Sequence, residues 1–407
     1  MKGPEIAVTG LGMVTPAGAG LDANWRAVCE GASTAAATDP RLAGLPVDFC
    51  AAVTDLDISA VGRRTVYRLD RFVQLVLAAA HEALADAGLS PADWDGPRVG
   101  VVIGCGMGGV ATWEKQHARL LEQGPEAVSP LLIPMLIPNM AAGEVALACG
   151  ARGPSFVVST ACASGATAVS AARDLLTAGV CDIVVAGGTE AANTPLTVTG
   201  FANLGALSRR CADPAAASRP FDADRDGFVM AEAAAVLVLE RADHAAARGR
   251  RPRALLAGCG SATDAHHPTA PHPEGRGARQ AMQAALRDAG LAPADVDHVN
   301  AHGTSTVLND SVEAQVITQV LPHGPYVTST KGVLGHSLGA TGAVEAALTV
   351  LAVQQSTVPP TANLENPDPA LELNLVAKTP VRLPVRAALS NSLGFGGHNV
   401  VLAFRTP

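Results

Sequence analysis

The sequence predicts a layered α/β protein made of two similar halves that are fused and packed together. Its 407 residues exceed the usual size of a single hydrophobic core. Near-continuous apolar runs alternate with helical segments, a pattern typical of strands that helices cover on both faces. Only 3% of the residues are aromatic, so the layers must pack through small side chains. This composition favours a sandwich over a barrel.

The chain begins with a predicted strand within residues 1–14. A lysine, a proline and several glycines interrupt this segment, whereas a secretory signal requires an unbroken apolar stretch. The sequence also lacks a continuous apolar segment approaching the ~20 residues that span a bilayer. These features indicate a cytoplasmic protein that does not associate with membranes.

A helical pattern with a glycine at its end occurs twice, 202 residues apart. The segments "EALADAGLSPADWD" (82–95) and "AALRDAGLAPADVD" (284–297) share ten residues in register. Each helix is expected to end at Gly88 or Gly290, because glycine readily adopts the left-handed conformation that follows a helix. The repeat therefore predicts two related α/β halves.

The polar, arginine-rich segment 240–256 is the expected boundary between these halves, which gives domains at 1–250 and 251–407. Apolar runs bounded by turn residues predict the internal strands. They lie at 98–104, 155–160, 181–188, 234–240 and 298–303.

Charge and cysteine content exclude several classes of function. The net charge of −8 gives no electrostatic support for binding nucleic acid. The eight cysteines are scattered without a C-x-x-C pair, which argues against a disulfide framework or a structural zinc site. Most of these thiols are expected to be reduced, buried and inert.

One cysteine, Cys162, follows an apolar run and precedes a helix of small residues in "VVSTACASGATAVSAARDLL". Its sulfur is expected at a helix N-terminus, where free N–H groups and the helix dipole stabilise a thiolate, the nucleophilic form. Gly165 and the neighbouring alanines leave room for a substrate. On this stretch alone, the alternative is a buried cysteine that only fills space.

Two histidines in the second half strengthen the catalytic interpretation. His302 directly follows a predicted strand, and His336 comes five residues after Lys331, just before another helix. The glycine-rich turn "NSLGFGGHN" allows close backbone approach at Phe395. Because open α/β sheets bind substrates beyond the carboxyl ends of their strands, Cys162 and both histidines are expected to converge there.

At these residues the sequence resembles the elongating β-ketoacyl-ACP synthases (type II ketosynthases of fatty-acid and polyketide synthesis) of the thiolase superfamily. The resemblance covers nearly the whole chain. Six motifs occur in the order typical of that family: "VTGLGMVTPAG", "STACASG", "RPFDADRDGFV", "NAHGTST", "KGVLGHSLGATG" and "NSLGFGGHN". It implies a five-layer αβαβα fold made of two related halves, and normally a dimer.

The resemblance also implies the chemistry of the nucleophile. Cys162 takes the acyl group from an acyl-ACP thioester, and the backbone N–H groups of Cys162 and Phe395 form an oxyanion hole. Phe395 doubles as a gate that moves when the cysteine is acylated. The reaction is a decarboxylative Claisen condensation with malonyl-ACP, which yields β-ketoacyl-ACP.

Four further residues acquire roles through the same resemblance. His302 and His336 hold the malonyl thioester carbonyl and stabilise the enolate while carbon dioxide leaves. Lys331 stays cationic beside them, hydrogen-bonded in a network with Glu345, and biases the charge state of His336. The family binds no metal or resident cofactor for this chemistry.

The remaining implied residues contact the substrate or the carrier. Thr304 and Thr306 look like contacts for the phosphopantetheine arm, which arrives on the acyl carrier protein. Met107, Leu131 and Leu132 correspond to the acyl pocket. An acidic carrier is expected to dock on clustered arginines, namely Arg63, Arg64, Arg68, Arg209 and Arg210.

The sequence leaves the pathway and the subunit partner open. Housekeeping fatty-acid elongation and polyketide synthesis fit equally well, the latter as a heterodimer with a chain-length-factor-like paralogue in place of a homodimer. A non-catalytic chain length factor is disfavoured, because that group typically carries another residue at the position of Cys162. A thiolase or chalcone-synthase-like enzyme that uses coenzyme A thioesters is also disfavoured, by the two histidines with "HGTST".

Two other motifs suggest chemistry different from that of a β-ketoacyl-ACP synthase. Gly104, Gly106 and Gly109 match the dinucleotide motif G-x-G-x-x-G, but no second strand ending in an acidic residue follows at the expected distance. The histidine-rich segment 266–272 lies among prolines, without a carboxylate or cysteine to complete a metal set. We therefore expect neither NAD binding nor a metal site.

Overall fold

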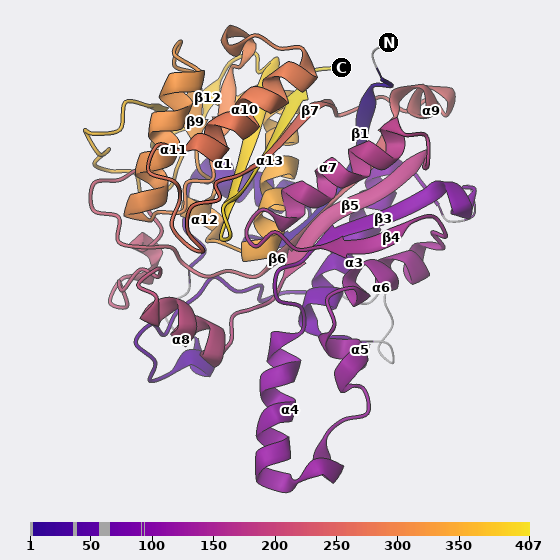
Figure 1. Cartoon of the computed structure of the whole chain (residues 1–407), viewed down its shortest axis with the longest axis vertical. Coiled ribbons are helices and arrows are strands. Elements are labelled where there is room, and N and C mark those ends of the chain that lie inside the picture. Colours follow the sequence, from indigo (N-terminus) through magenta and orange to yellow (C-terminus); the bar gives the residue numbers. More distant parts are fainter. Residues whose placement is uncertain (1–2, 36–38, 57–65, 91, 93) are drawn as a thin grey trace.

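The structure, a computed structural model, describes residues 3–35, 39–56, 66–90, 92 and 94–407. Of the arginines expected to dock a carrier, Arg63 and Arg64 lie outside the described residues. The predicted layered α/β fold is confirmed (Figure 1).

The sheet of the N-terminal half contains five main strands in the order β4-β3-β5-β6-β1. The first three are mutually parallel, whereas β6 pairs antiparallel with both β5 and β1. The predicted N-terminal strand and the four predicted internal strands of this half are confirmed. Their bounds are β1 Ile6–Thr15, β3 Val99–Gly104, β4 Ser155–Val158, β5 Ile183–Glu190 and β6 Ala233–Arg241.

The sheet of the C-terminal half repeats this arrangement in the order β9-β8-β13-β14-β7, with short β11 beyond β9. Here too the first three strands run parallel, and β14 pairs antiparallel with both β13 and β7. The repeat in the sequence thus reflects two halves of the same topology. The strands are β7 Ala254–Thr263, β8 His298–Asn300, β9 Tyr326–Thr328, β11 Asn374–Leu375, β13 Ala387–Gly394 and β14 His398–Arg405.

A short antiparallel contact joins the two sheets, because Ile6–Val8 of β1 pairs with Ala254–Leu256 of β7. Three shorter strands lie outside the main order. They are β2 Gly18–Ala19, which pairs with β1, and β10 Thr357–Val358 and β12 Val381–Arg382, which pair with each other.

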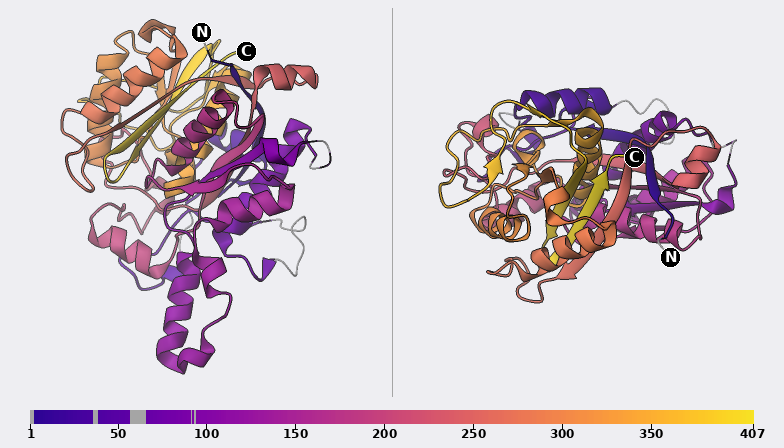
Figure 2. Two further views of the ribbon diagram at one scale, coloured as in Figure 1. Left: turned by 45° about the vertical axis from the view of Figure 1, so that its right-hand side comes forward. Right: turned by 90° about the horizontal axis from the view of Figure 1, so that it is seen from above.

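Helices form three layers around the two sheets (Figures 1 and 2). One outer layer packs on the N-terminal sheet, the central layer lies between the sheets, and the other outer layer covers the C-terminal sheet. The five layers therefore follow the order αβαβα. The layers are, in that order, α3 Arg71–Ala87 with α6 Met140–Cys149, α7 Ser164–Thr177 with α13 Thr341–Gln355, and α10 Arg276–Ala289 with α11 Val307–Val320.

Strand β6 is apolar from Ala233 to Leu239 because both of its faces are buried there. Leu237 and Leu239 belong to the core between the sheets, whereas Val236 and Val238 belong to the core beneath α3. Successive side chains of a strand point to opposite faces, and here both faces are buried. Alternating polar residues are therefore excluded from this strand.

The two repeated helices end as the sequence predicts. Gly88 follows α3 at φ 63°, and Gly290 follows α10 at φ 67°. In both cases the N–H group of the glycine bonds back to the last turn, which closes the helix in the left-handed conformation that glycine tolerates best.

The central helices α7 and α13 approach each other closely near their N-termini. A Cβ atom on Gly165 would lie 2.6 Å from the backbone nitrogen of Ala343, and one on Gly342 would lie 2.6 Å from that of Ala166. Glycine at both positions therefore lets the backbones touch. This contact brings the helix that follows Cys162 against the helix that follows His336.

The remaining helices lie outside these layers. Helices α4 and α5 extend away from the body of the molecule as an arm (Figure 1). No helix within the described residues is long and apolar enough to cross a membrane. The bounds are α1 Leu21–Glu30, α4 Val110–Gln123, α5 Leu132–Leu136, α8 Pro195–Asn203, α9 Ala242–Ala247 and α12 Lys331–Leu334.

Candidate active site

Three turns that follow carboxyl ends of strands, together with the turn after α12, meet around one cavity of about 340 Å³. Cys162 comes after β4, His302 after β8 and Phe395 after β13, and all three line this cavity together with His336. The two halves of the molecule both contribute, since Cys162 lies in the first half and the other three residues in the second. The predicted convergence of the cysteine and the histidines is confirmed.

Cys162 lies in a tight corner between β4 and α7. Ala161, directly before it, has a φ of 50°, a left-handed conformation that costs free energy for any residue other than glycine. From the opposite side, a Cβ atom on Gly394 would lie 2.6 Å from the carbonyl oxygen of Thr160. The glycine therefore allows the Phe395 turn to close over the cysteine.

The protonation of Cys162 differs from the sequence-based expectation. Burial raises the pKa of its thiol to about 11, although the charge of Lys331 and the backbone N–H groups of Phe395 and Cys162 act in the opposite direction. The structure does not support the expected thiolate at the helix N-terminus, because removal of the sulfur from water outweighs these favourable interactions. The raised pKa of Cys162 favours the protonated thiol.

His302 is held by a buried carboxylate. The backbone N–H groups of His302 and Gly303 donate to the two oxygens of Glu313 at 2.7 and 2.8 Å, and the Asn391 amide donates to the same carboxylate at 3.1 Å. Glu313 lies on α11, so this contact fixes the turn after β8 against the helix that follows it. Neither Glu313 nor Asn391 was predicted from the sequence.

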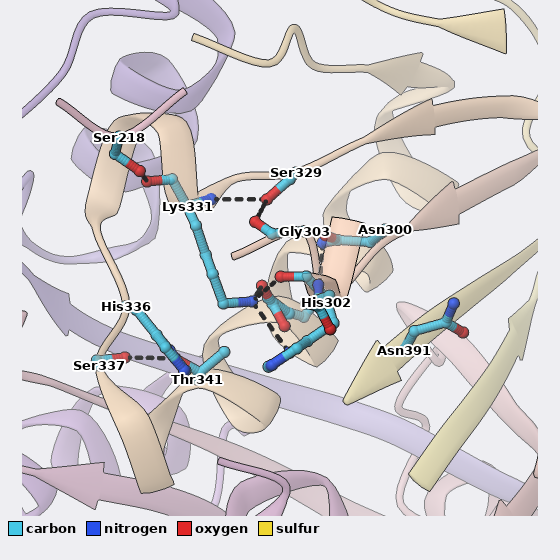
Figure 3. Close-up of polar contacts among 12 residues, drawn as sticks. Ser218, Asn300, His302, Gly303, Ser329, Lys331, His336, Ser337, Thr341 and Asn391 are labelled. Carbon is cyan, nitrogen blue, oxygen red and sulfur yellow. Dashed lines mark hydrogen bonds and ion pairs between the residues drawn. The ribbon is translucent and has the colours of Figure 1, made fainter. Parts of the chain in front are cut away.

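Lys331 reaches from the start of α12 toward the His302 ring (Figure 3). Its Nζ lies 3.4 Å from His302 Nδ1 and also donates to the His302 carbonyl oxygen. The same ammonium pairs with Glu345 on α13, as the resemblance implied. Burial raises the pKa of Glu345 to about 8, against the opposing effect of Lys331.

The two histidine rings lie close and edge to face, with centroids 5.4 Å apart. His336 Nδ1 lies 3.0 Å from Thr341 Oγ1, and the Phe228 ring packs against its other side. Burial, reinforced by the positive charge of Lys331, lowers the pKa of both histidines well below the usual value. Both imidazoles are therefore neutral and can act as N–H donors.

The mouth of the cavity carries the other predicted contacts. Thr304 and Thr306 line it and lie within hydrogen-bonding distance of each other, at 2.9 Å. Phe395 packs against Phe201 of α8, with ring centroids 6.3 Å apart. This places one aromatic ring of each half beside the opening.

The predicted acyl-pocket residues do not join this cavity. The described residues that line it do not include Met107, Leu131 or Leu132. Leu131 and Leu132 lie at the start of α5 on the projecting arm, and all three side chains retain partial exposure. Their assignment to an acyl pocket therefore stays a prediction.

The remaining candidate docking arginines differ in their exposure and in their contacts with neighbouring oxygen atoms. Arg68 and Arg209 have exposed side chains. Arg210 donates to the carbonyl oxygen of Asp224 at 2.6 Å and lies 3.7 Å from the Asp226 carboxylate. The carboxylate also accepts the backbone N–H of Arg209 at 3.1 Å. The positive charge near the mouth is thus partly compensated.

Protein atoms surround the glycines that match a dinucleotide motif. A Cβ atom on Gly104 would lie 2.2 Å from the Ser164 backbone, and one on Gly106 would lie 2.6 Å from Glu190 Oε2. The Glu190 carboxylate accepts N–H groups from Gly106 and, across the two halves, from Gly339. The motif thus serves close packing within the chain.

The histidine-rich segment forms a loop beside the mouth. The rings of His266 and His272 lie 5.0 Å apart, and the backbone N–H of His272 donates to Asp264. Among the described residues, no group of three or more histidine, cysteine, aspartate or glutamate side chains is arranged to hold a metal ion. All eight cysteines are free thiols.

Comparison with known families agrees with this geometry. The profile of the β-ketoacyl synthase N-terminal domain matches residues 4–245, and that of the C-terminal domain matches residues 253–365. The chain belongs to the β-ketoacyl synthase family. The domain division at residues 250 and 251 stays a prediction.

Two curated β-ketoacyl synthases illustrate the similarity in sequence. The chain is 45% identical to 3-oxoacyl-[acyl-carrier-protein] synthase 2 of Synechocystis over 406 residues, which covers 98% of each chain. It is 41% identical to the enzyme of the same name from Staphylococcus aureus over 410 residues, again covering 98% of each.

Solved structures of β-ketoacyl synthases share the fold throughout. A β-ketoacyl synthase from Burkholderia phymatum superposes with a TM-score of 0.93 at 32% identity, covering 99% of this chain and 100% of the other. A ketosynthase described as bound to the hexaketide and in complex with its type II polyketide acyl-carrier protein gives a TM-score of 0.92 at 32% identity, with full coverage of both chains.

Proposed function

We propose that this β-ketoacyl synthase performs a decarboxylative Claisen condensation between an acyl group on Cys162 and malonyl-ACP, giving β-ketoacyl-ACP. The observation that carries the proposal is the single cavity shared by Cys162 from one half and by His302 and His336 from the other. A nucleophile and two neutral donors around one cavity suit a reaction that alternates between acyl transfer and enolate formation.

In the first step, the Cys162 sulfur attacks the carbonyl carbon of the acyl thioester, and the carrier's pantetheine sulfur leaves. The proton of the Cys162 thiol ends on the departing sulfur. The backbone N–H groups of Cys162 and Phe395 lie beside the reacting sulfur and stabilise the oxyanion. Because the free thiol has a raised pKa, proton removal has to accompany attack.

In the second step, His302 and His336 donate to the malonyl thioester carbonyl. The bond to the carboxylate breaks, carbon dioxide leaves, and the electron pair moves into an enolate. Each neutral imidazole donor contributes about 3 kcal/mol in comparable oxyanion sites. The enolate carbon attacks the acyl-Cys162 carbonyl, the C–S bond to Cys162 breaks, and the freed sulfur takes a proton from solvent water.

The carrier supplies the phosphopantetheine arm, so this reaction assigns no resident cofactor to the chain. We assign Thr304 and Thr306 as contacts for that arm, and this assignment is supported by their position in the lining of the cavity that contains Cys162. We assign Phe395, which packs against Phe201, as a gate, and its position in the lining of the cavity supports this assignment. The cytoplasmic location expected from the sequence stays a prediction.

Intact-mass analysis tests the proposal directly. Incubation with acyl-ACP should add one acyl group to the wild type and none to Cys162→Ala. Addition of malonyl-ACP should then remove the acyl group and yield β-ketoacyl-ACP. An unchanged wild-type mass across a range of acyl-ACPs would support a non-catalytic subunit instead.

A second question is whether the enzyme acts in fatty-acid elongation or in polyketide synthesis. The curated fatty-acid-type relatives above are 41–45% identical to this chain, whereas the ketosynthase from a polyketide complex is 32% identical. We therefore place fatty-acid elongation first, with a homodimer as the functional unit. Another similar structure is a ketosynthase with its chain length factor, so purification with and without genomic neighbours should separate a homodimer from a heterodimer.

A further inference from the structure

Glu190, the last residue of β5, is a fully buried carboxylate that the steps described above do not use. Its Oε2 accepts the backbone N–H groups of Gly106 at 2.8 Å and of Gly339 at 3.1 Å. Its Oε1 accepts the N–H of Met107 at 3.0 Å and the thiol of Cys105 at 3.5 Å. Four donors thus face this side chain, and the ionised form suits them because both of its oxygens can only accept.

These hydrogen bonds join the two halves of the molecule. Gly106 and Met107 follow β3 in the first half, whereas Gly339 lies in the second half, in the turn between His336 and α13. A Cβ atom on Gly106 or on Gly339 would lie 2.6 Å from Glu190 Oε2. Glycine at both positions therefore lets the two backbones approach the carboxylate. We call Glu190 with these three backbone donors the carboxylate clasp.

The clasp is connected to the wall of the reaction cavity through Leu338, which directly precedes Gly339. Leu338 lines the cavity together with Cys162 and His336. Its φ is 46°, a left-handed conformation that costs free energy for leucine. Such a conformation persists only where the surrounding structure holds it. The hydrogen bond from Gly339 to Glu190 is one of the contacts that hold Leu338 in place.

The charge of Glu190 has a second effect, on the nucleophile. Burial raises the pKa of Glu190, and the N–H donors of the clasp act in the opposite direction. The negative charge in turn adds to the effect of burial in raising the pKa of the Cys162 thiol. A neutral glutamine would fill the same space, but it would lack this charge and would turn an NH₂ group toward backbone donors.

We propose that Glu190 is a positioning residue for the condensation, whose ionised carboxylate clasps the turn between His336 and α13 to the first half and so holds Leu338 and His336 beside Cys162. This inference rests on the proposed function. Glu190 is not among the described residues that line the cavity. It therefore acts through Gly339 on the cavity wall, and through its charge on the Cys162 thiol.

Two substitutions separate the reach of the side chain from its charge. Glu190→Gln keeps the length but removes the charge and one of the two acceptor oxygens. Glu190→Asp keeps the charge but is too short to bond to both halves. Both variants should release carbon dioxide from malonyl-ACP about 10- to 100-fold more slowly than the wild type, because a displacement of about 1 Å at a reacting group has an effect of this order.

Alkylation of Cys162 by iodoacetamide separates the two variants from each other. At pH 8, the rate should rise about threefold or more in Glu190→Gln, because loss of a nearby negative charge increases the thiolate fraction. It should stay within about twofold of the wild-type rate in Glu190→Asp, which retains the charge. Glu372→Gln, at an exposed position before β11, is the matched control and should leave both rates unchanged.

Two results overturn the inference. One is an unchanged rate of carbon dioxide release in folded Glu190→Gln, and the other is an equal change of the alkylation rate in both variants, which indicates a residue that only fills space. Thermal unfolding shows whether each variant is folded. If neither variant folds, hydrogen exchange of the wild type decides, because the Gly339 N–H should be protected for minutes or longer. Exchange of this N–H within seconds overturns the inference.

The proposed function can fail separately. If the wild type releases no carbon dioxide from malonyl-ACP and does not condense it with the acyl group, the proposed function is wrong, and the positioning role falls with it. If the wild type condenses and Glu190→Gln condenses at the same rate, only the positioning role is overturned.

Discussion

Lys331 Nζ lies 3.4 Å from Nδ1 of His302 and fixes which nitrogen of that ring carries the proton. A lysine ammonium can donate hydrogen bonds but cannot accept them. Nδ1 must therefore accept, which leaves the proton of the neutral ring on Nε2. The ring is thereby prepared as a donor toward a substrate oxygen.

Lys331→Met should disable decarboxylation. The substitution removes both the donor to His302 Nδ1 and a positive charge that reinforces the effect of burial on the pKa of the two rings. The release of carbon dioxide from malonyl-ACP should fall about 100-fold, the loss typical of one oxyanion donor. Lys115→Met on exposed α4 is the matched control and should be unaffected. Equal rates for the two variants would contradict the assigned tautomer.

The buried histidines predict that acid destabilises the protein. The pKa of His336 is lowered in the folded state, so below pH ~6.5 the unfolded chain binds a proton that the folded chain excludes. Stability from this group is therefore intact above pH 6.5 and lost as pH falls. Between pH 7.5 and 5.5, the wild type should lose about 1.4 kcal/mol more unfolding free energy than His336→Asn.

Urea unfolding at the two pH values measures this difference. The effects of other titrating groups, including Glu345 with its raised pKa, are common to both proteins and largely cancel in the comparison. His81→Asn, on an exposed position of α3, should retain the wild-type loss. If His336→Asn and the wild type lost the same unfolding free energy, His336 would have to bind a proton in the folded protein.

The raised pKa of Cys162 predicts how its reactivity depends on pH. Because the thiolate is the reactive form, alkylation by iodoacetamide should accelerate about tenfold per pH unit from pH 7 toward pH 10. Free cysteine, with a pKa near ~8.5, should level off earlier. Peptide mass spectrometry follows the modification at this position. If the alkylation rate reached a plateau by pH 8, the Cys162 thiol would ionise near neutral pH, as expected from the sequence.

The contact between the central helices predicts a large effect of one methyl group. Gly342→Ala places a Cβ atom 2.6 Å from the Ala166 backbone nitrogen, so α13 must move away from α7. Such overpacking costs about 1–3 kcal/mol of unfolding free energy, and activity should fall because the shift separates Cys162 from His336. Thermal unfolding and condensation assays measure both effects.

Gly143→Ala supplies the matched control for this substitution. Gly143 lies within α6, and a Cβ atom there would have no neighbour within 4 Å. Alanine should therefore leave stability unchanged or raise it by up to ~1 kcal/mol through its higher helix propensity. Equal effects at the two glycines would show that the central helices do not touch as described.

The sequence alone determined the local structure of this protein. Strands such as β6 could be predicted because burial on both faces demands an uninterrupted apolar run. The ends of α3 and α10 could be predicted because Gly88 and Gly290 accept a backbone conformation that other residues resist. Cys162 and His302 could be selected because each follows a strand, where α/β folds place their sites. His336 follows α12 and was selected from its glycine-rich turn.

Only the tertiary structure decided how these groups behave together. The pKa of Cys162 depends on burial of its sulfur, on the charge of Lys331 and on the backbone N–H of Phe395, and no helix-end pattern contains that information. Glu313 reaches the His302 backbone only because α11 packs against the turn after β8. Burial and contacts between distant segments arise only from the whole fold. They set the charge of each site residue, the tautomer of the histidines and the access of substrate to the cavity.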